Sequence, residues 1–363
     1  MAKLTSRELE LLARRLEPEL RKAFVQAIVA ARNDAAVQAV AELLRAGRVE
    51  QVLTALGMDA ARFSPLAEAV RSAFVAGAGA GIQEIPPVRL SLDPIITGSY
   101  RPRSPSPVLR ASFDLRNPAA ERWLATNSSR LVTEIIESQR QVIRGVLQQG
   151  MIAGRNPRQT ALDIVGRVGE TGRRSGGVVG LTSEQSQYVI NVRAQLASGD
   201  PKVMAAYFDR QRRDKRLDGI VKRAIAAGKP VSQADIDKIA GRYAERLLAL
   251  RGEMIARTES IASLNAGREE AYRQQIEAGK LAPENVECTW SDTNDDRTRH
   301  SHRAMNGQKR MFGEPFQAPS GALMNYPGDT SLGAGPEETI GCRCMKQYRI
   351  NMAAEVLRGQ QIR

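Results

Sequence analysis

The sequence predicts a mainly α-helical protein with a small, turn-rich α+β module near its C-terminus. Ala, Leu, Arg, Glu and Gln dominate long stretches, in which apolar residues recur at spacings of three and four. Aromatic residues make up only 4% of the 363 residues, so the helices are expected to pack through small and aliphatic side chains. From residue 281 onwards the helical period gives way to closely spaced turn sequences.

Residues 1–83 are expected to form an N-terminal helical region. The segments SRELELLARRL and AAVQAVAELLRA both have amphipathic spacing, and the GAGAG run at 77–81 is expected to end this block. Residues 84–112 follow as a proline-rich segment, with a short strand candidate at VRLSL. This segment is interpreted as an interdomain linker or as an extended arm along a partner's surface.

Residues 113–280 are expected to form a helical domain. Asn117 suits a helix N-cap because Pro118 follows it at the first helical position. Thr182 and Gln185 have the spacing of a capping box, which predicts another helix start. A long helix is expected further on, through the sequence IAGRYAERLLALRGEMIARTESIASLNAGREEAYRQQIEAG.

The formal net charge of +13 favours contact with nucleic acid or another acidic partner. The glycine-rich loop at 169–180 is not a phosphate-binding P-loop, because the Lys-Ser/Thr pair that opens the following helix is absent. The densest basic cluster lies further along, where seven basic residues stand against three aspartates. It is interpreted either as a solvated helix face with internal salt bridges or as a contact surface for double-stranded DNA or an acidic protein. Its basic residues are Arg210, Arg212, Arg213, Lys215, Arg216, Lys222 and Arg223.

Residues 281–350 are expected to form the small C-terminal module, and 351–363 a tail. Turn sequences such as YPGD and GAGP alternate with strand candidates at VECTW, QKRMF and CRCMKQYRI. A small module with little apolar content often needs a covalent or metal cross-link for stability.

All three cysteines and both histidines of the chain lie in this module. Thiolate and imidazole ligands in a tetrahedral set suit zinc. The predicted ligand set is Cys288, His302, Cys342 and Cys344, with His300 as the alternative imidazole. A catalytic metal is a second possibility. The third is that His302 caps a turn and the cysteines are small buried apolar groups.

The stretch around Asp295, Arg297, Arg299 and His302 contains residue types used in acid–base chemistry. The chain has no HExxH motif and no Gly-x-Ser-x-Gly motif, and no second carboxylate stands at a persuasive spacing. A D-x-R-T-R turn more often forms internal salt bridges and side-chain-to-backbone hydrogen bonds. The protein is therefore not expected to be an enzyme.

Three cysteines are too few for a disulfide framework, so synthesis in a reducing cytoplasm is expected. The charged, amphipathic N-terminus is not a secretory signal. No window approaches the roughly 18 consecutive apolar residues of a membrane span.

The order and spacing of the motifs at the C-terminus resemble the phage head morphogenesis family, the Mu F-like minor capsid proteins. The resemblance covers roughly 113–350, and its strongest motifs lie in 255–348. It includes the helical sequence IARTESIASLNAGREEAY before the module. The residues that carry it within the module are Trp290, Asp295, Arg297, Thr298, Arg299, His302, Gly307, Phe316, Tyr326, Pro327, Gly328, Asp329, Cys342, Arg343 and Cys344.

The resemblance implies a minor head protein of a tailed phage or prophage, acting in head morphogenesis and as a candidate in DNA packaging or ejection. It implies binding to the portal protein, contact with other capsid or scaffold proteins, and proximity to double-stranded DNA. The implied location is the phage head interior or portal vertex, with host cytoplasm during assembly. The alternatives are a zinc-stabilised DNA-binding protein and a metal-dependent nuclease.

The resemblance also bears on the metal. Family members with a suspected metal site have Cys-x-x-Cys before the conserved glycine and a histidine just before Cys-x-Cys. Here Arg299 and His302 stand at the two cysteine positions, and Thr339 stands at the histidine position. Cys288 is the residue expected to compensate.

Overall fold

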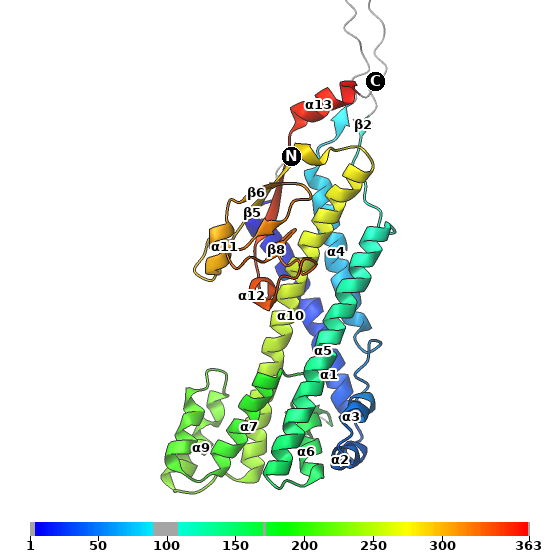
Figure 1. The fold of residues 1–363 in the computed structure, drawn as a ribbon. Helices are drawn as coiled ribbons and strands as arrows, with labels where there is room; N and C mark the ends of the chain where they lie inside the picture. The colour runs from blue at the N-terminus through cyan, green and yellow to red at the C-terminus, as the bar shows by residue number, and fades with distance from the viewer. Residues whose placement is uncertain (1–3, 90–107, 170–171, 362–363) are drawn as a thin grey trace, which may run out of the picture. The chain divides into compact units, whose positions relative to one another are not determined.

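The computed structural model describes residues 4–89, 108–169 and 172–361. It confirms the predicted fold class: most of the chain is helical, and small antiparallel sheets lie near the C-terminus (Figure 1). No helix among the described residues is long and apolar enough to cross a membrane.

The chain divides into two compact units, each assembled from segments that are distant in sequence. The module unit comprises Met1–Leu20, Glu68–Ala125 and Met254–Arg363. The helical unit comprises Arg21–Ala67 and Thr126–Glu253. The folding domains expected from the sequence remain a prediction.

Four long helices contribute residues to both units: α1 (Ser6–Asp34), α4 (Ser64–Glu84), α5 (Pro118–Ile152) and α10 (Gln233–Glu277). The remaining elements of the helical unit are short: α2 (Val37–Arg45), α3 (Val49–Ala55), α6 (Pro157–Val165), β3 (Arg167–Val168), β4 (Arg174–Ser175), α7 (Ser183–Ala197), α8 (Pro201–Ala205), η1 (Ala206–Asp209), η2 (Lys215–Leu217) and α9 (Asp218–Ala226).

Local capping interactions set the helix starts that the sequence predicts. The Asn117 side chain accepts a hydrogen bond from the Ala119 amide at 2.8 Å, and α5 begins at Pro118. Thr182 and Gln185 form the reciprocal capping box that opens α7. These interactions satisfy amide groups that have no partner within the first turn of a helix.

The GAGAG run does not end the first helical block, contrary to expectation. It lies inside α4, where Gly77 faces α10 within the module unit. A Cβ atom on Gly77 would lie 2.3 Å from the Leu264 carbonyl oxygen, and one on Gly267 would lie 2.0 Å from the Phe74 carbonyl oxygen. Glycine is therefore needed at both positions because the two backbones approach too closely for a side chain.

In the helical unit, three buried side chains hold the glycine-rich loop that follows β4. Arg32 donates hydrogen bonds to the carbonyls of Gly177 and Val179, and it also pairs with Glu245 at 2.6 Å. Arg251 donates to the carbonyls of Gly180 and Leu181, at 3.0 and 2.7 Å.

Gln139 is the third of these side chains, and together with Arg32 and Arg251 it forms the anchor of the glycine-rich loop. Its side chain accepts from the Gly180 amide at 2.7 Å and donates to the Leu181 carbonyl at 3.0 Å. Burial lowers the pKa of Arg32, and it lowers that of Arg251 to about 10. Both groups remain charged at neutral pH and satisfy backbone carbonyls that are shielded from water.

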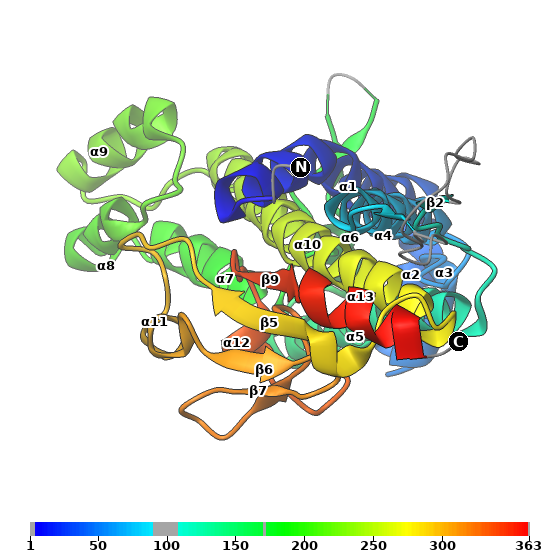
Figure 2. The ribbon, with the colours of Figure 1, turned by 90° about the horizontal axis from the view of Figure 1, so that it is seen from above.

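The C-terminal module is built on a three-stranded antiparallel sheet with the order β6-β5-β9 (Figure 2). Cys288 of the central strand pairs with Tyr348 on one side and with Arg310 on the other. The residues of the central strand alternate, so Val286, Cys288 and Trp290 face the core.

The elements of the module and its tail are η3 (Pro283–Asn285), β5 (Val286–Ser291), α11 (His300–Met305), β6 (Lys309–Met311), β7 (Phe316–Gln317), β8 (Leu323–Met324), α12 (Pro336–Thr339), β9 (Met345–Ile350) and α13 (Met352–Gln361).

The proline-rich segment is described only at its ends. Within it, β1 (Val88–Arg89) pairs antiparallel with β2 (Val108–Leu109). The predicted strand at VRLSL therefore begins as a strand, and its remainder lies outside the described residues, as do the arm's central prolines.

Candidate metal centre

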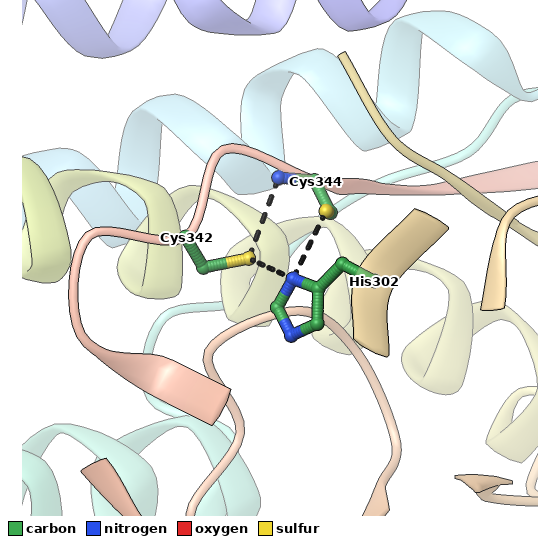
Figure 3. Close-up of side chains that lie close together, drawn as sticks. All are labelled: His302, Cys342 and Cys344. Atoms are coloured by element: carbon green, nitrogen blue, oxygen red, sulfur yellow. Dashed lines mark hydrogen bonds between the residues drawn. The ribbon is translucent and has the colours of Figure 1, made fainter. Parts of the chain in front are cut away.

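Three of the predicted ligands meet in the module. His302 comes from α11, and Cys342 and Cys344 come from the chain between α12 and β9. All three side chains are buried, with exposed fractions of 1%, 4% and 2%. Figure 3 shows both sulfur atoms directed at the imidazole ring of His302. The cluster therefore joins two segments some forty residues apart.

The donor atoms are spaced as a bound metal requires. The Nδ1 atom of His302 lies 3.5 Å from Sγ of Cys342 and 3.3 Å from Sγ of Cys344. All three donor atoms lie within 4.8 Å of one another. Tetrahedral zinc with about 2.0–2.1 Å to nitrogen and about 2.3 Å to sulfur places N and S about 3.5 Å apart. The residues present fit three vertices of such a site.

A buried carboxylate lies on the opposite edge of the imidazole. Oε2 of Glu338 is 3.1 Å from Nε2 of His302, close enough for an ion pair although not aligned for a hydrogen bond. Ser301 donates to Oε2 at 2.9 Å and Ser320 to Oε1 at 2.8 Å. A carboxylate at the second ring nitrogen orients metal-binding histidines and keeps the first nitrogen free for the metal.

The protonation of the cluster favours a thiolate. Hydrogen bonds from Cys344 and His302 lower the pKa of Cys342 well below its usual value despite burial. The hydrogen bond with Cys342, together with burial, raises the pKa of Cys344. Burial acts to lower the pKa of His302, but the hydrogen bond to Cys342 raises it overall. A divalent cation bound by these donor atoms would displace the protons of both thiols.

Cys288 and His300 are not brought to this cluster. Cys288 lies in the middle of β5, and burial raises the pKa of its thiol to about 12. Its sulfur is 3.8 Å from the Val286 carbonyl oxygen. His300 begins α11 and is exposed. Among the described residues, only His302, Cys342 and Cys344 form a group of this kind. The expected four-residue ligand set is therefore reduced to three.

Several residues of the family motif shape the chain around the cluster. Asp295 accepts two hydrogen bonds of 2.5 Å from Arg343, the residue between the two cysteines. This bidentate pair lowers the pKa of Asp295. Arg299 donates to the carbonyls of Glu338 and Ile340. These contacts tie the D-x-R-T-R turn to the Cys-x-Cys segment.

Other motif residues have structural positions. Gly307 and Gly328 adopt positive φ angles of 80° and 87°, which favour glycine. Asp329, which follows Pro327 and Gly328, accepts hydrogen bonds from the amides of Asn325 and Ser331, at 2.9 and 2.8 Å. Arg297 is largely exposed and lies 3.9 Å from Asp295.

Trp290 packs against the cluster from β5. Its side chain is fully buried, and its ring meets the His302 ring edge-on, with centroids 5.3 Å apart. A second edge-on contact, at 5.4 Å, is made with Phe316. Its indole N–H has no hydrogen-bond partner within the part of the chain that the structure describes. The proximity of this N–H acts to lower the pKa of Cys344, but the hydrogen bond with Cys342 and burial outweigh it and raise that pKa.

The basic cluster in the helical unit is not one continuous helix face. Arg213 pairs with Asp218 at 3.1 Å and Arg216 with Asp214 at 2.8 Å, so two of the seven basic side chains are paired within the cluster. Arg210 donates to the Gln195 side chain at 2.8 Å. The remaining members are exposed: Arg212, Lys215, Lys222 and Arg223.

The sequence carries no signal that Glu338 belongs to this site. Glu338 has no recognisable spacing to His302 or to the cysteines, and its neighbour Glu337 is identical in type but exposed. Two acidic residues directly after Pro336 are typical of the first turn of a helix, where negative charge is favourable. Only the folded geometry separates the buried carboxylate from the exposed one.

The fold and the cluster together define a mainly helical protein with a small C-terminal module, in which three buried side chains could hold a metal ion. Residues 215–347 match the family of Phage Mu protein F like proteins, somewhat more than a third of the chain. The resemblance seen in the sequence is thereby confirmed for this segment, which contains the whole cluster. The match supports a phage head-related protein associated with the virion. Comparisons with curated proteins and with solved structures give no match.

Proposed function

We propose that the protein is a minor head protein of a tailed phage or prophage that binds the portal protein during head morphogenesis. The observation that carries the proposal is the Mu F-like segment at 215–347, in which motif residues connect the D-x-R-T-R turn and the Cys-x-Cys segment into one scaffold. The Asp295–Arg343 pair and the Arg299 contacts hold that scaffold together. The expected contacts with other capsid or scaffold proteins belong to the same proposal.

Co-purification tests this role. The chain would be expressed together with the portal protein encoded in the same phage genome, and the assembly would be isolated by size-exclusion chromatography. A stable complex is the expected result. Separate elution at all salt concentrations, with both proteins folded, would contradict portal binding. An Asp295→Asn variant, which weakens the scaffold, serves as a comparison for module-dependent binding.

We further propose that the module is stabilised by zinc held by His302, Cys342 and Cys344. Two thiolates and an imidazole are a donor set that suits zinc, and the N···S separations match a tetrahedral ion. When bound, the zinc would supply a cross-link between α11 and the segment before β9. That cross-link compensates for the low apolar content of the module.

The exposed basic side chains support a secondary role in contact with double-stranded DNA. Arg212, Lys215, Lys222 and Arg223 are exposed, whereas Arg213 is paired with Asp218, and Arg216 is paired with Asp214 although it is also exposed. Phosphate contacts made by the exposed set predict binding that weakens steeply with salt. The charge reversal Lys222→Glu/Arg223→Glu should abolish retention on DNA, whereas Arg213→Gln should reduce retention far less. Equal losses in both variants would contradict this assignment.

A further inference from the structure

The cluster provides three protein donors where tetrahedral zinc takes four ligands. Within the described ranges, 4–89, 108–169 and 172–361, no fourth His, Cys, Asp or Glu joins the group. Glu338 is not a substitute, because it lies at Nε2 of His302 and the sulfur atoms lie at Nδ1. Structural zinc sites have four protein ligands, whereas three protein ligands leave one coordination position for a water or another exogenous ligand.

A small cavity opens at the cluster. It has a volume of about 80 Å³, and its lining includes His302, Cys342 and Cys344. Thr293 and Thr298 also line it, and their hydroxyl oxygens are 3.0 Å apart. The space therefore adjoins the three residues of the cluster, has polar walls, and accommodates a water or a small ion.

The walls of this cavity are cationic. Arg297, Arg299 and Arg343 all line it. The described residues of the lining include no carboxylate: Asp295 pairs with Arg343 from outside it, and Glu338 lies at the opposite edge of the His302 ring. Zinc with two thiolates and a neutral imidazole carries no net charge of its own. The electrostatic environment thus favours an anion over neutral water at the remaining position.

We propose that the metal of this chain has an open fourth coordination position, which takes a small inorganic anion from solution through the arginine-lined cavity. This proposal rests on the proposed zinc site and adds the ligand of its free position. The donor set is built by His302, Cys342 and Cys344. Arg297 attracts the anion, and because it is exposed and only weakly paired it can move towards it.

Cobalt-loaded full-length protein provides the test, because Co²⁺ replaces Zn²⁺ in such sites and its visible absorption reports its ligands. Azide is the probe. With one Co²⁺ bound per chain, azide should change the visible spectrum along a saturable binding curve. The Arg297→Gln variant should bind Co²⁺ equally well but bind azide several-fold more weakly, with a smaller dependence on ionic strength. Arg14→Gln, an exposed arginine on α1 in the same unit, is the matched control and should behave as the wild type.

The outcomes separate the two proposals. If Co²⁺ binds but azide leaves the spectrum unchanged, the fourth position is closed, and the open-site inference is overturned while the metal site stands. If Co²⁺ does not bind, both proposals fail. If azide binds the Arg297→Gln and wild-type proteins equally, the cationic wall does not select the ligand, and the role given to Arg297 is wrong.

Discussion

The helical unit and the module unit each hold an irregular loop with buried polar side chains, but they use different chemistry. In the helical unit, Arg32, Gln139 and Arg251 meet the backbone groups of the glycine-rich loop with complementary donors and acceptors. In the module unit, two sulfur atoms and one ring nitrogen face one another. The first anchor is complete within the chain. The second places the lone pairs of two sulfur atoms and one nitrogen next to one another, so it needs a proton or a metal ion between them to be stable.

This difference predicts which unit depends on an added component. An anchor made of guanidinium and carbonyl groups persists in any buffer near neutral pH. A Cys–Cys–His cluster loses its stabilisation when the ion is removed, because the ligation free energy contributes directly to folding.

The largest expected effect is that of metal removal. A ligand present at about 1,000 times its dissociation constant stabilises the folded state by about 4 kcal/mol. Treatment with a strong chelator should therefore lower the melting temperature, and added zinc should restore it. Hydrogen exchange should show loss of protection in β5 and β9, whereas protection at residues 176–182 stays unchanged. Equal loss in both regions would break the distinction between the two anchors.

The next largest effect concerns the anchor in the helical unit. Arg32→Met leaves the carbonyls of Gly177 and Val179 and the Glu245 carboxylate without their partner, which should cost about 3 kcal/mol of unfolding free energy. Arg21→Met is the control, because Arg21 forms an exposed pair with Glu253 at 3.6 Å, and its loss should cost less than about 1 kcal/mol. Denaturant unfolding measures both. A loss of similar size for the two variants would show that burial of Arg32 contributes nothing.

A smaller effect is expected from the carboxylate behind His302. Glu338→Gln keeps the shape but removes the charge at Nε2, and such changes typically weaken metal affinity about 10- to 100-fold. Competition with a coloured chelator measures the affinity. Glu337→Gln, at the adjacent and exposed position, should leave it unchanged. Unaltered affinity in the Glu338 variant would show that the carboxylate does not orient the imidazole.

The smallest effect concerns the Asp214–Arg216 ion pair of the helical unit. Hydrogen bonds from Arg216 lower the pKa of Asp214 to about 2, below its unfolded value of about 3.9. Its contribution to stability is therefore full above about pH 4 and lost as the pH falls towards 2. The difference in melting temperature between the wild type and Asp214→Asn should shrink over that range. A constant difference from pH 6 to pH 2.5 would contradict the assignment.

Features encoded within a few residues could be predicted from the sequence. The helix starts at Pro118 and after Thr182 depend on side chains that reach their own first turn. The clustering of His302 with Cys342 and Cys344 was also foreseen, because these rare residue types gather in one module.

Features that depend on tertiary packing could not be predicted. Cys288 was expected at the metal, but the pairing of β5 with β9 places it opposite Tyr348. The GAGAG run was expected to break a helix, yet α10 packs so closely that Gly77 is needed inside one. Glu338 carries no local signal that distinguishes it from Glu337. In each case, the role of the residue depends on a contact with a residue that is distant in sequence.

We propose that His302, Cys342 and Cys344 hold a zinc ion and that Cys288 is not one of its ligands. Elemental analysis of protein purified without added zinc tests this most directly, in the wild type, Cys288→Ser and Cys342→Ser. We expect about one zinc per chain in the first two proteins and almost none in the third, because a tightly bound metal is retained through purification. Less than roughly a tenth of a zinc in the wild type, or loss of zinc on changing Cys288, would contradict it.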